Sequence, residues 1–218
     1  MIPVPLIIAG IAAGTLIAQK LKSGTSKNLQ KSIPQNVLSK LAEPLHANAK
    51  TTDGKHLIEH AIAINHITML NALIANGANV NGRSADGTPF LIKAVKSGHS
   101  AFVQSLLDAG ASPNCMDAKG KTPLFYVSNS NDVILKILLQ AGADPNAQDS
   151  EGNYAIFHIL NKGITSKCFA NRVNALSRVS ADFTVRDLKN NTLLFFAQSV
   201  SPVSTYFRNI DINAQNSD

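Results

Sequence analysis

Cysteine and charge are both scarce in this sequence. Two cysteines, Cys115 and Cys168, stand in 218 residues, with no CxxC pair and no regular spacing. This usage excludes a disulfide framework and favours free thiols in a reducing compartment. Charged residues are only 16% of the chain and apolar ones 44%, a composition that excludes wholesale disorder.

The net charge of +6 is unevenly distributed. From Thr51 onward, 14 basic residues face 13 acidic ones, so the body of the chain is close to neutral. A nucleic-acid-binding domain needs a clustered positive face on its folded part, and we therefore predict no nucleic-acid partner. The excess charge precedes Thr51, where one acid, Glu43, accompanies six lysines: Lys20, Lys22, Lys27, Lys31, Lys40 and Lys50.

The N-terminal stretch Ile2–Ala18 contains 17 residues without a charge. A helix of this length spans roughly 25 Å, near the lower limit for crossing the hydrocarbon core of a bilayer. No basic residue precedes the stretch and four lysines follow it within residues 20–31, so the positive-inside rule places the repeat domain on the cytoplasmic side. The sequence therefore predicts a single-pass transmembrane anchor over residues 1–19.

Two other interpretations of this stretch stay open. One is a cleaved signal peptide, although that would need a basic start and a clear small-residue cleavage site. The other is a buried N-terminal helix of a soluble protein. Gly10 and Gly14 also form a GxxxG spacing, which permits close packing of two membrane helices and hence a weak dimer.

Residues 20–47 connect the stretch to the rest of the chain. Lys20–Gln35 is a basic linker, which either lies along an anionic membrane surface or acts as a solvated tether. Pro34–Leu41 can form a short helix whose apolar face covers the open end of an array of repeats. We predict that this helix is an N-terminal cap.

A repeated unit fills residues 48–218. Its clearest copy is Asp86–Asn114, which predicts a helix from Pro89 to about Lys96 and a second from about Ser100 to Asp108. Each helix has one apolar face. Two helices this short cannot bury those faces alone, so the unit needs neighbours.

Copies of the unit align on a turn position at intervals of 33, 33, 32 and 38 residues, occupied by Gly54, Gly87, Gly120, Gly152 and Asn190. Four residues later comes an apolar position predicted to face inward, occupied by Ile58, Leu91, Leu124, Ile156 and Leu194. An asparagine precedes each turn, where its amide is expected to bond the local backbone, at Asn48, Asn81, Asn114 and Asn146.

On these residues the chain resembles the ankyrin repeat family. The resemblance rests on the period of 33, which is highly specific, and on Gly98-His99, Gly110-Ala111 and Gly120-Lys121-Thr122-Pro123-Leu124. It implies an all-α ankyrin-repeat solenoid over residues 48–218, in which about five helix-loop-helix units stack and their turns project as fingers. The predicted hydrophobic helix precedes this solenoid.

The chain also departs from the family pattern. No unit keeps the histidine that follows Thr-Pro-Leu in the family, and Phe125 stands there in the third unit. The fourth unit has about five extra residues around Gly163–Lys167, which predict a longer loop between its helices. The fifth has a shortened second helix, Val203–Arg208, and the chain ends at Asp218, as a natural end or as part of a longer array.

Signatures of catalysis are nearly absent, because no Ser-His-Asp set, phosphate loop or pair of acids stands out. His56, Glu59 and His60 do match HxxEH, in which two histidines on one helix face bind zinc and the glutamate activates a water. The repeat register places this motif inside a first helix, and no third ligand is evident. We therefore predict a structural role, no metal, no cofactor and no enzyme, with a zinc hydrolase as the alternative.

If the array binds a protein, the resemblance places the partner on a concave face made by the fingertips and the first helices. This face is polar and has several lysines, which favours a partner with an acidic patch. Carried over by register, its residues are Arg83, Asp86, Lys96, Met116, Lys119, Lys121, Asn129, Gln148, Glu151, Asn161 and Lys162.

We thus predict a non-enzymatic scaffold for protein–protein interaction that is tethered to a membrane. A bacterial protein that restrains another protein, as inhibitors and immunity proteins do, is one setting. A bacterial effector that acts on host proteins is the alternative.

Overall fold

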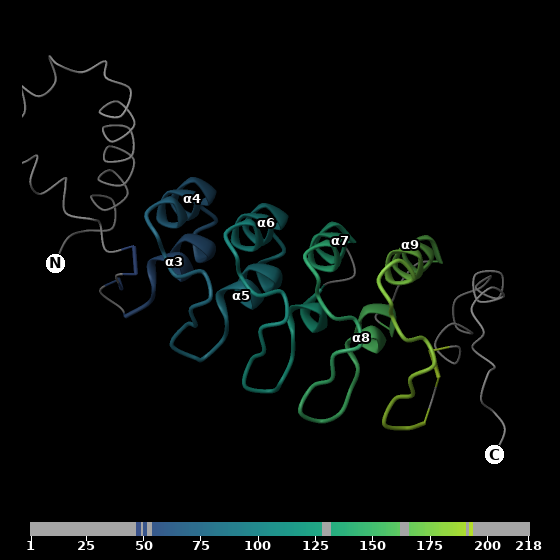
Figure 1. The fold of residues 1–218 in the computed structure, drawn as a ribbon. Coiled ribbons are helices and arrows are strands. Elements are labelled where there is room, and N and C mark those ends of the chain that lie inside the picture. The colour runs from purple at the N-terminus through teal and green to yellow at the C-terminus, as the bar shows by residue number, and fades with distance from the viewer. Residues whose placement is uncertain are drawn as a thin grey trace, which may run out of the picture. The chain divides into compact units, whose positions relative to one another are not determined.

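A computed structural model describes residues 47–48, 50–51, 54–127, 132–161, 166–190 and 192–193 (Figure 1). The predicted anchor, linker, capping helix and Val203–Arg208 helix lie outside these residues and stay predictions. The chain divides into two compact units, residues 1–86 and 87–218. The described residues form helices and isolated β-bridges but no strand.

The first unit contains the helix pair α3 (Leu57–Ala63) and α4 (Ile67–Ala75). The two helices contact each other, with Ile58, Ala61 and Leu70 almost fully buried. His66 occupies the N-cap of α4, where its Nδ1 accepts a hydrogen bond from the Met69 amide at 3.2 Å.

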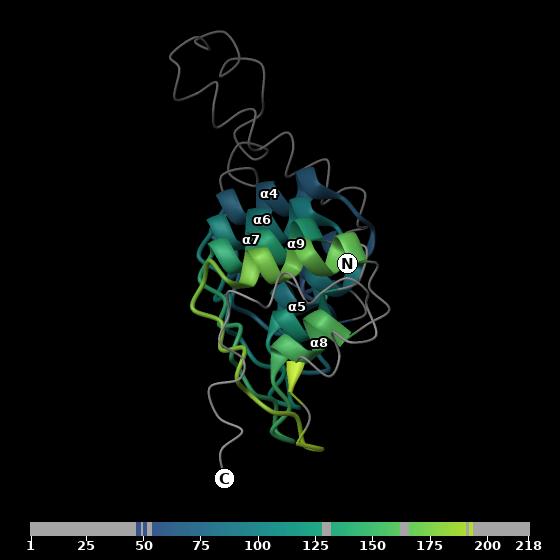
Figure 2. The same cartoon turned by 90° about the vertical axis from the view of Figure 1, so that its right-hand side faces the viewer.

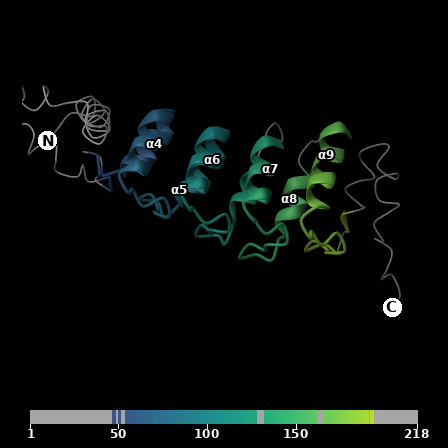
Figure 3. The same ribbon diagram turned by 45° about the horizontal axis from the view of Figure 1, so that its top comes forward.

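The second unit contains α5 (Phe90–Ser97), α6 (Ser100–Asp108), the 3₁₀ helix η1 (Pro123–Tyr126), α7 (Asp132–Gln140), α8 (Ala155–Asn161) and α9 (Ser166–Leu176). The first helices of successive repeats, α5, η1 and α8, contact one another in that order, and so do the second helices, α6, α7 and α9. They form two layers, with the loops projecting beyond the first helices (Figures 1 and 2). Each projecting loop returns to the next first helix before the chain crosses to a second helix (Figure 3).

The core of the second unit follows the repeat register. Leu91, Leu124 and Ile156, the predicted inward-facing residues, are at most 1% exposed. The second-helix residues Phe102 and Leu106 are also buried, as their spacing predicted. Apolar side chains of adjacent repeats thus supply the neighbours that a single helix pair lacks.

The predicted helix bounds hold for the second repeat and fail in the third. Helix α6 begins and ends where expected, and α5 is displaced by one residue because Pro89 is its N-cap. The first helix of the third repeat is a four-residue 3₁₀ turn, after which Val127 is extended. Four polar residues, Ser128–Asn131, follow it in the sequence, and such side chains compete with helical backbone hydrogen bonds.

The sequence predicted that the extra residues of the fourth repeat form a longer loop between its helices. Only some of them do so. Helix α9 begins at Ser166, inside the predicted loop, and has 11 residues, whereas α6 and α7 have nine. Part of the insertion therefore lengthens the second helix.

Asn48, Asn114 and Asn146 bond the backbone of the next repeat, which corrects the local bonds predicted for them. Asn114 accepts a hydrogen bond from the Asp144 amide at 2.8 Å and donates one to the Gly142 carbonyl at 3.0 Å. Asn146 likewise accepts from the Asp182 amide at 2.7 Å. The backbone amide of Asn146 instead donates its hydrogen bond to the Asp144 carboxylate.

Candidate protein-binding surface

Two aspartates fix the backbone of the projecting loops in the second unit. The Asp117 carboxylate accepts hydrogen bonds from the amides of Lys119 (2.9 Å) and Lys121 (3.0 Å). The Asp149 carboxylate, in a residue only 6% exposed, does the same for Glu151 (3.0 Å) and Asn153 (2.9 Å). The loops are consequently held in one conformation before any partner arrives.

Tyr126 links one loop to the first-helix layer. Its hydroxyl donates a hydrogen bond to Asp117, and the ammonium of Lys96 on α5 lies 4.0 Å from the centre of its ring. A cation over an aromatic face is attracted by the electrons of the ring. Lys96, Tyr126 and Asp117 therefore form a chain of contacts across two repeats.

Lys121 and Asp149 join adjacent loops. The Lys121 ammonium lies 3.6 Å from an Asp149 carboxylate oxygen and 5.9 Å from the centre of the Phe125 ring. The Ser150 amide also donates to the Lys119 carbonyl at 2.9 Å, so the two loops are connected through the backbone as well.

These contacts displace the pKa of three groups. Burial alone would raise the pKa of Asp117, but hydrogen bonds from Tyr126 and two backbone amides, with the charge of Lys96, hold it below its ordinary 3.8. Burial is likewise outweighed at Asp149, whose pKa is lowered by Asn153, Glu151 and Lys121. Burial and the neighbouring Asp117 raise the pKa of Tyr126 to about 12.

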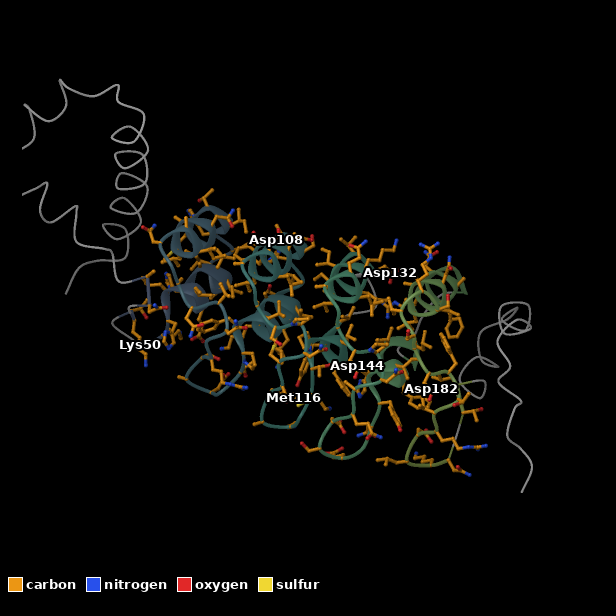
Figure 4. The ribbon with its side chains drawn as sticks, viewed as in Figure 1. Lys50, Asp108, Met116, Asp132, Asp144 and Asp182 are labelled. Carbon is orange, nitrogen blue, oxygen red and sulfur yellow. The ribbon has the colours of Figure 1, made fainter. Side chains whose placement is uncertain are left out.

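Several predicted binding residues are exposed on the loops of the second unit. Met116 is 49% exposed, and Figure 4 shows it on the projecting loop between α6 and η1. Lys119, Gln148 and Glu151 are exposed on the same loop and the next one. Among the described residues, the Lys119 side chain makes no ion pair or hydrogen bond, so its charge is available to a partner.

The other predicted binding residues differ in their surroundings. Lys96 and Lys121 are held by the internal contacts described above, although Lys96 is also exposed. Arg83 and Asp86 belong to the first unit, where the Asp86 carboxylate accepts a hydrogen bond from Ser84. Asn129, Lys162 and the side chain of Asn161 lie outside the described residues.

Sequence reasoning missed two residues of this surface. Leu188 is 66% exposed on the loop at residues 186–189, next to Asp187, whose carboxylate accepts a hydrogen bond from the Lys189 amide at 2.9 Å. Tyr126 was missed because its partner, Asp117, lies nine residues away in a different segment of the repeat. A leucine beside the structural aspartate of a projecting loop was the available signal for Leu188.

The HxxEH motif lies at the start of the first unit's helix pair. His56 is the N-cap of α3, and Glu59 is 7% exposed within the buried face of that helix. Across the part of the chain that the structure describes, no group of three or more His, Cys, Asp or Glu residues could hold a metal ion. The structural interpretation of the motif therefore stays a prediction, which metal analysis can test.

No helix within the described ranges is long and apolar enough to span a bilayer.

Comparison with known proteins gives one clear result. The model of ankyrin repeats in three copies matches residues 11–117 and 57–149. No curated protein matches the chain. Ankyrin repeats are generally non-enzymatic and imply a scaffold for protein–protein interaction. The two matches together cover more than half of the sequence, so the chain belongs to the ankyrin repeat family.

Proposed function

We propose that this protein is a membrane-tethered scaffold that holds a protein partner on its projecting loops and first helices. The observation that carries this proposal is the exposure of Met116 and Lys119 on a loop whose backbone is fixed by Asp117. A loop that is already ordered loses little conformational entropy on binding. Met116 supplies an apolar contact, and Lys119 favours a partner with an acidic patch beside it.

Affinity purification of the full chain from native membranes, followed by mass spectrometry, tests the proposal. Met116→Asp should remove the partner that the unsubstituted protein retains, since it places a charge in the proposed apolar contact. Val133→Asp is the matched control, because Val133 is 57% exposed on α7, in the second-helix layer. Equal recovery of the partner by both variants would overturn the assignment of this surface.

Lys119→Glu tests the charge complementarity separately. Rim charges mostly affect the association rate and its salt dependence. The substitution should slow association at low ionic strength and have little effect at high salt. A salt-independent change would mean that Lys119 acts through loop structure instead of through its charge.

The proposed tether is the uncharged stretch Ile2–Ala18. It is supported by its length and by the lysines that follow it, with the repeats on the cytoplasmic side. The family match begins at residue 11, inside this stretch, so the same residues could instead start an additional repeat-like segment. Membrane fractionation of the full chain distinguishes the two.

The biological setting follows from the identity of the partner. A partner from the same bacterial cell, bound and held inactive, would fit an inhibitor or immunity-type protein. A partner from a host cell would fit an effector. Recovery of the partner from each source in parallel separates these two proposals.

A further inference from the structure

The second-helix layer contains a groove that the proposed function does not use. It has a volume of about 350 Å³ and lies between α7 and α9, which contact each other. One wall is formed by Lys136 and Gln140 of α7, and the other by Asn171, Asn174 and Arg178 in or just after α9. The positions within α7 and α9 recur every three or four residues, so each lies on one face of its helix, and Arg178 belongs to the turn that follows α9.

The groove is lined by two cations and no carboxylate. Lys136 and Arg178 are exposed, and within the described part of the chain neither has an ion-pair or hydrogen-bond partner for its side chain. The one acid in α7, Asp132, accepts a hydrogen bond from Arg172 at 2.7 Å, which neutralises it. The remaining lining is amide groups over an apolar floor that includes Leu139.

The repeat register shows that packing does not require these cations. One repeat earlier, the positions of Lys136 and Gln140 are held by Gln104 and Asp108 on α6, and there the amide donates to the carboxylate at 2.7 Å. The α6 face is thus internally paired and carries a negative charge. The face formed by α7 and α9 differs from the α6 face because its charge is positive and its charged side chains have no partner among the described residues.

We propose that the groove between α7 and α9 binds an acidic, extended peptide segment of a protein partner. Arg178 can donate two parallel hydrogen bonds to a carboxylate, Lys136 adds a second positive charge, and the amides can bond the peptide backbone. Residues 171–178 of the α9 wall span about 10 Å, which about three residues of extended peptide cover. Two cations over so short a length fit a peptide better than a nucleic acid, which needs a longer basic track.

A fluorescein-labelled peptide of four glutamates and two leucines is a suitable probe for the full-length protein. Fluorescence anisotropy should show saturable binding that weakens with salt, and the same peptide with glutamines in place of the glutamates should bind far less. Lys136→Gln combined with Arg178→Gln should reduce affinity about tenfold or more, because both charge-assisted contacts are lost. Circular dichroism checks that the variant is folded.

A matched variant, Lys50→Gln with Lys189→Gln, removes two exposed positive charges that lie outside the groove and should bind the peptide as the unsubstituted protein does. The glutamate peptide with a photoreactive group should cross-link to α7 or α9. No saturation by about 1 mM peptide, an equal loss in the matched variant, cross-links elsewhere, or tighter binding of a single-stranded oligonucleotide through the same two residues would overturn the proposal.

Discussion

The hydroxyl of Tyr126 donates to Asp117, a carboxylate that also holds two backbone amides of its loop. A hydrogen bond to an ionised group is stronger than one between neutral groups. The pKa of Asp117 and of Asp149 is lowered in the folded protein, so this source of stability is complete above their ordinary pKa of 3.8 and is lost as the pH falls below it. The pKa of Tyr126 is shifted in the opposite direction, so the stability that Tyr126 contributes is lost as the pH rises from 10 to about 12.

Tyr126→Phe should therefore lower the free energy of unfolding by about 1 kcal/mol at pH 7, a value reduced from that of a buried pair because both groups are partly solvated. The difference should shrink as the pH falls below 3.8 toward the lowered pKa of Asp117 in the folded protein. Urea unfolding at both pH values measures it. Tyr154→Phe is the control and should change stability by less than about 0.5 kcal/mol. A loss that is independent of pH would contradict the role given to Asp117.

Gly120 is the residue where two constraints coincide. Its φ is +69°, and a Cβ built on it would lie 2.9 Å from both the amide nitrogen and the hydroxyl of Ser150. Gly87 occupies the same register position with φ +78° and has nothing within 4 Å. The two glycines thus separate backbone strain from steric conflict.

Gly87→Ala should cost about 1–2 kcal/mol through left-handed strain alone. Gly120→Ala should cost at least about 1 kcal/mol more, because its methyl group also pushes on the neighbouring loop. Thermal unfolding of the two variants side by side gives the difference. Equal losses would mean that the loop of Ser150 moves away freely, in spite of its bond to Lys119.

At the scale of whole elements, Arg172 connects three helices. Its side chain is fully buried on α9, its Nε donates to Asp132 at the start of α7 at 2.7 Å, and its Nη1 donates to the Ile159 carbonyl of α8 at 2.8 Å. Figure 4 labels Asp132 on α7. A buried cation is tolerated only while these partners remain.

Asp132→Asn should accordingly destabilise the protein by about 3–5 kcal/mol, since it leaves the guanidinium buried without its counter-charge. Arg172→Met together with Asp132→Leu should cost much less, because both members of the pair are replaced by apolar groups. Urea unfolding of Arg172→Met, of Asp132→Leu and of the double variant completes a double-mutant cycle. Additive losses would show that the two residues do not act as a pair.

Element boundaries were predictable where the signals are local. Gly98 and Gly110 end their helices in left-handed conformations, and α6 begins and ends as its sequence indicated. Asn190 has φ +62°, in agreement with its alignment to the turn glycines. Such signals depend on the conformational preferences of a few neighbouring residues, and these preferences can be inferred from the sequence alone.

Contacts between repeats were not predictable in the same way. The asparagine bonds join residues about 30 apart, and the Arg172–Asp132 pair joins residues 40 apart. Their partners depend on how far each repeat is displaced from the last, which the periodicity does not fix. For the candidate surface, the sequence identified exposed Met116 and Lys119, but it did not reveal that Lys96 and Lys121 are held by internal partners.

At the scale of the whole molecule, the main prediction concerns the tether. A deletion of Ile2–Ala18 should move the rest of the protein out of the membrane fraction, because no other uncharged stretch of the sequence is as apolar. The repeats should remain folded, since their core consists of contacts between helices of residues 57–176. Carbonate extraction followed by circular dichroism of the released protein measures both effects.

Orientation gives the sharper version of this test. The positive-inside rule attributes the orientation of the tether to the lysines that follow it. A variant with arginines added before Ile2 and glutamine in place of Lys20, Lys22, Lys27 and Lys31 should therefore favour the opposite topology. Protease added from outside should digest the repeats of that variant and spare those of the unsubstituted protein. An unsubstituted chain that stays in the soluble fraction would rule out the tether, and would leave residues 11–46 to be explained as an additional repeat-like segment, in line with where the family match begins.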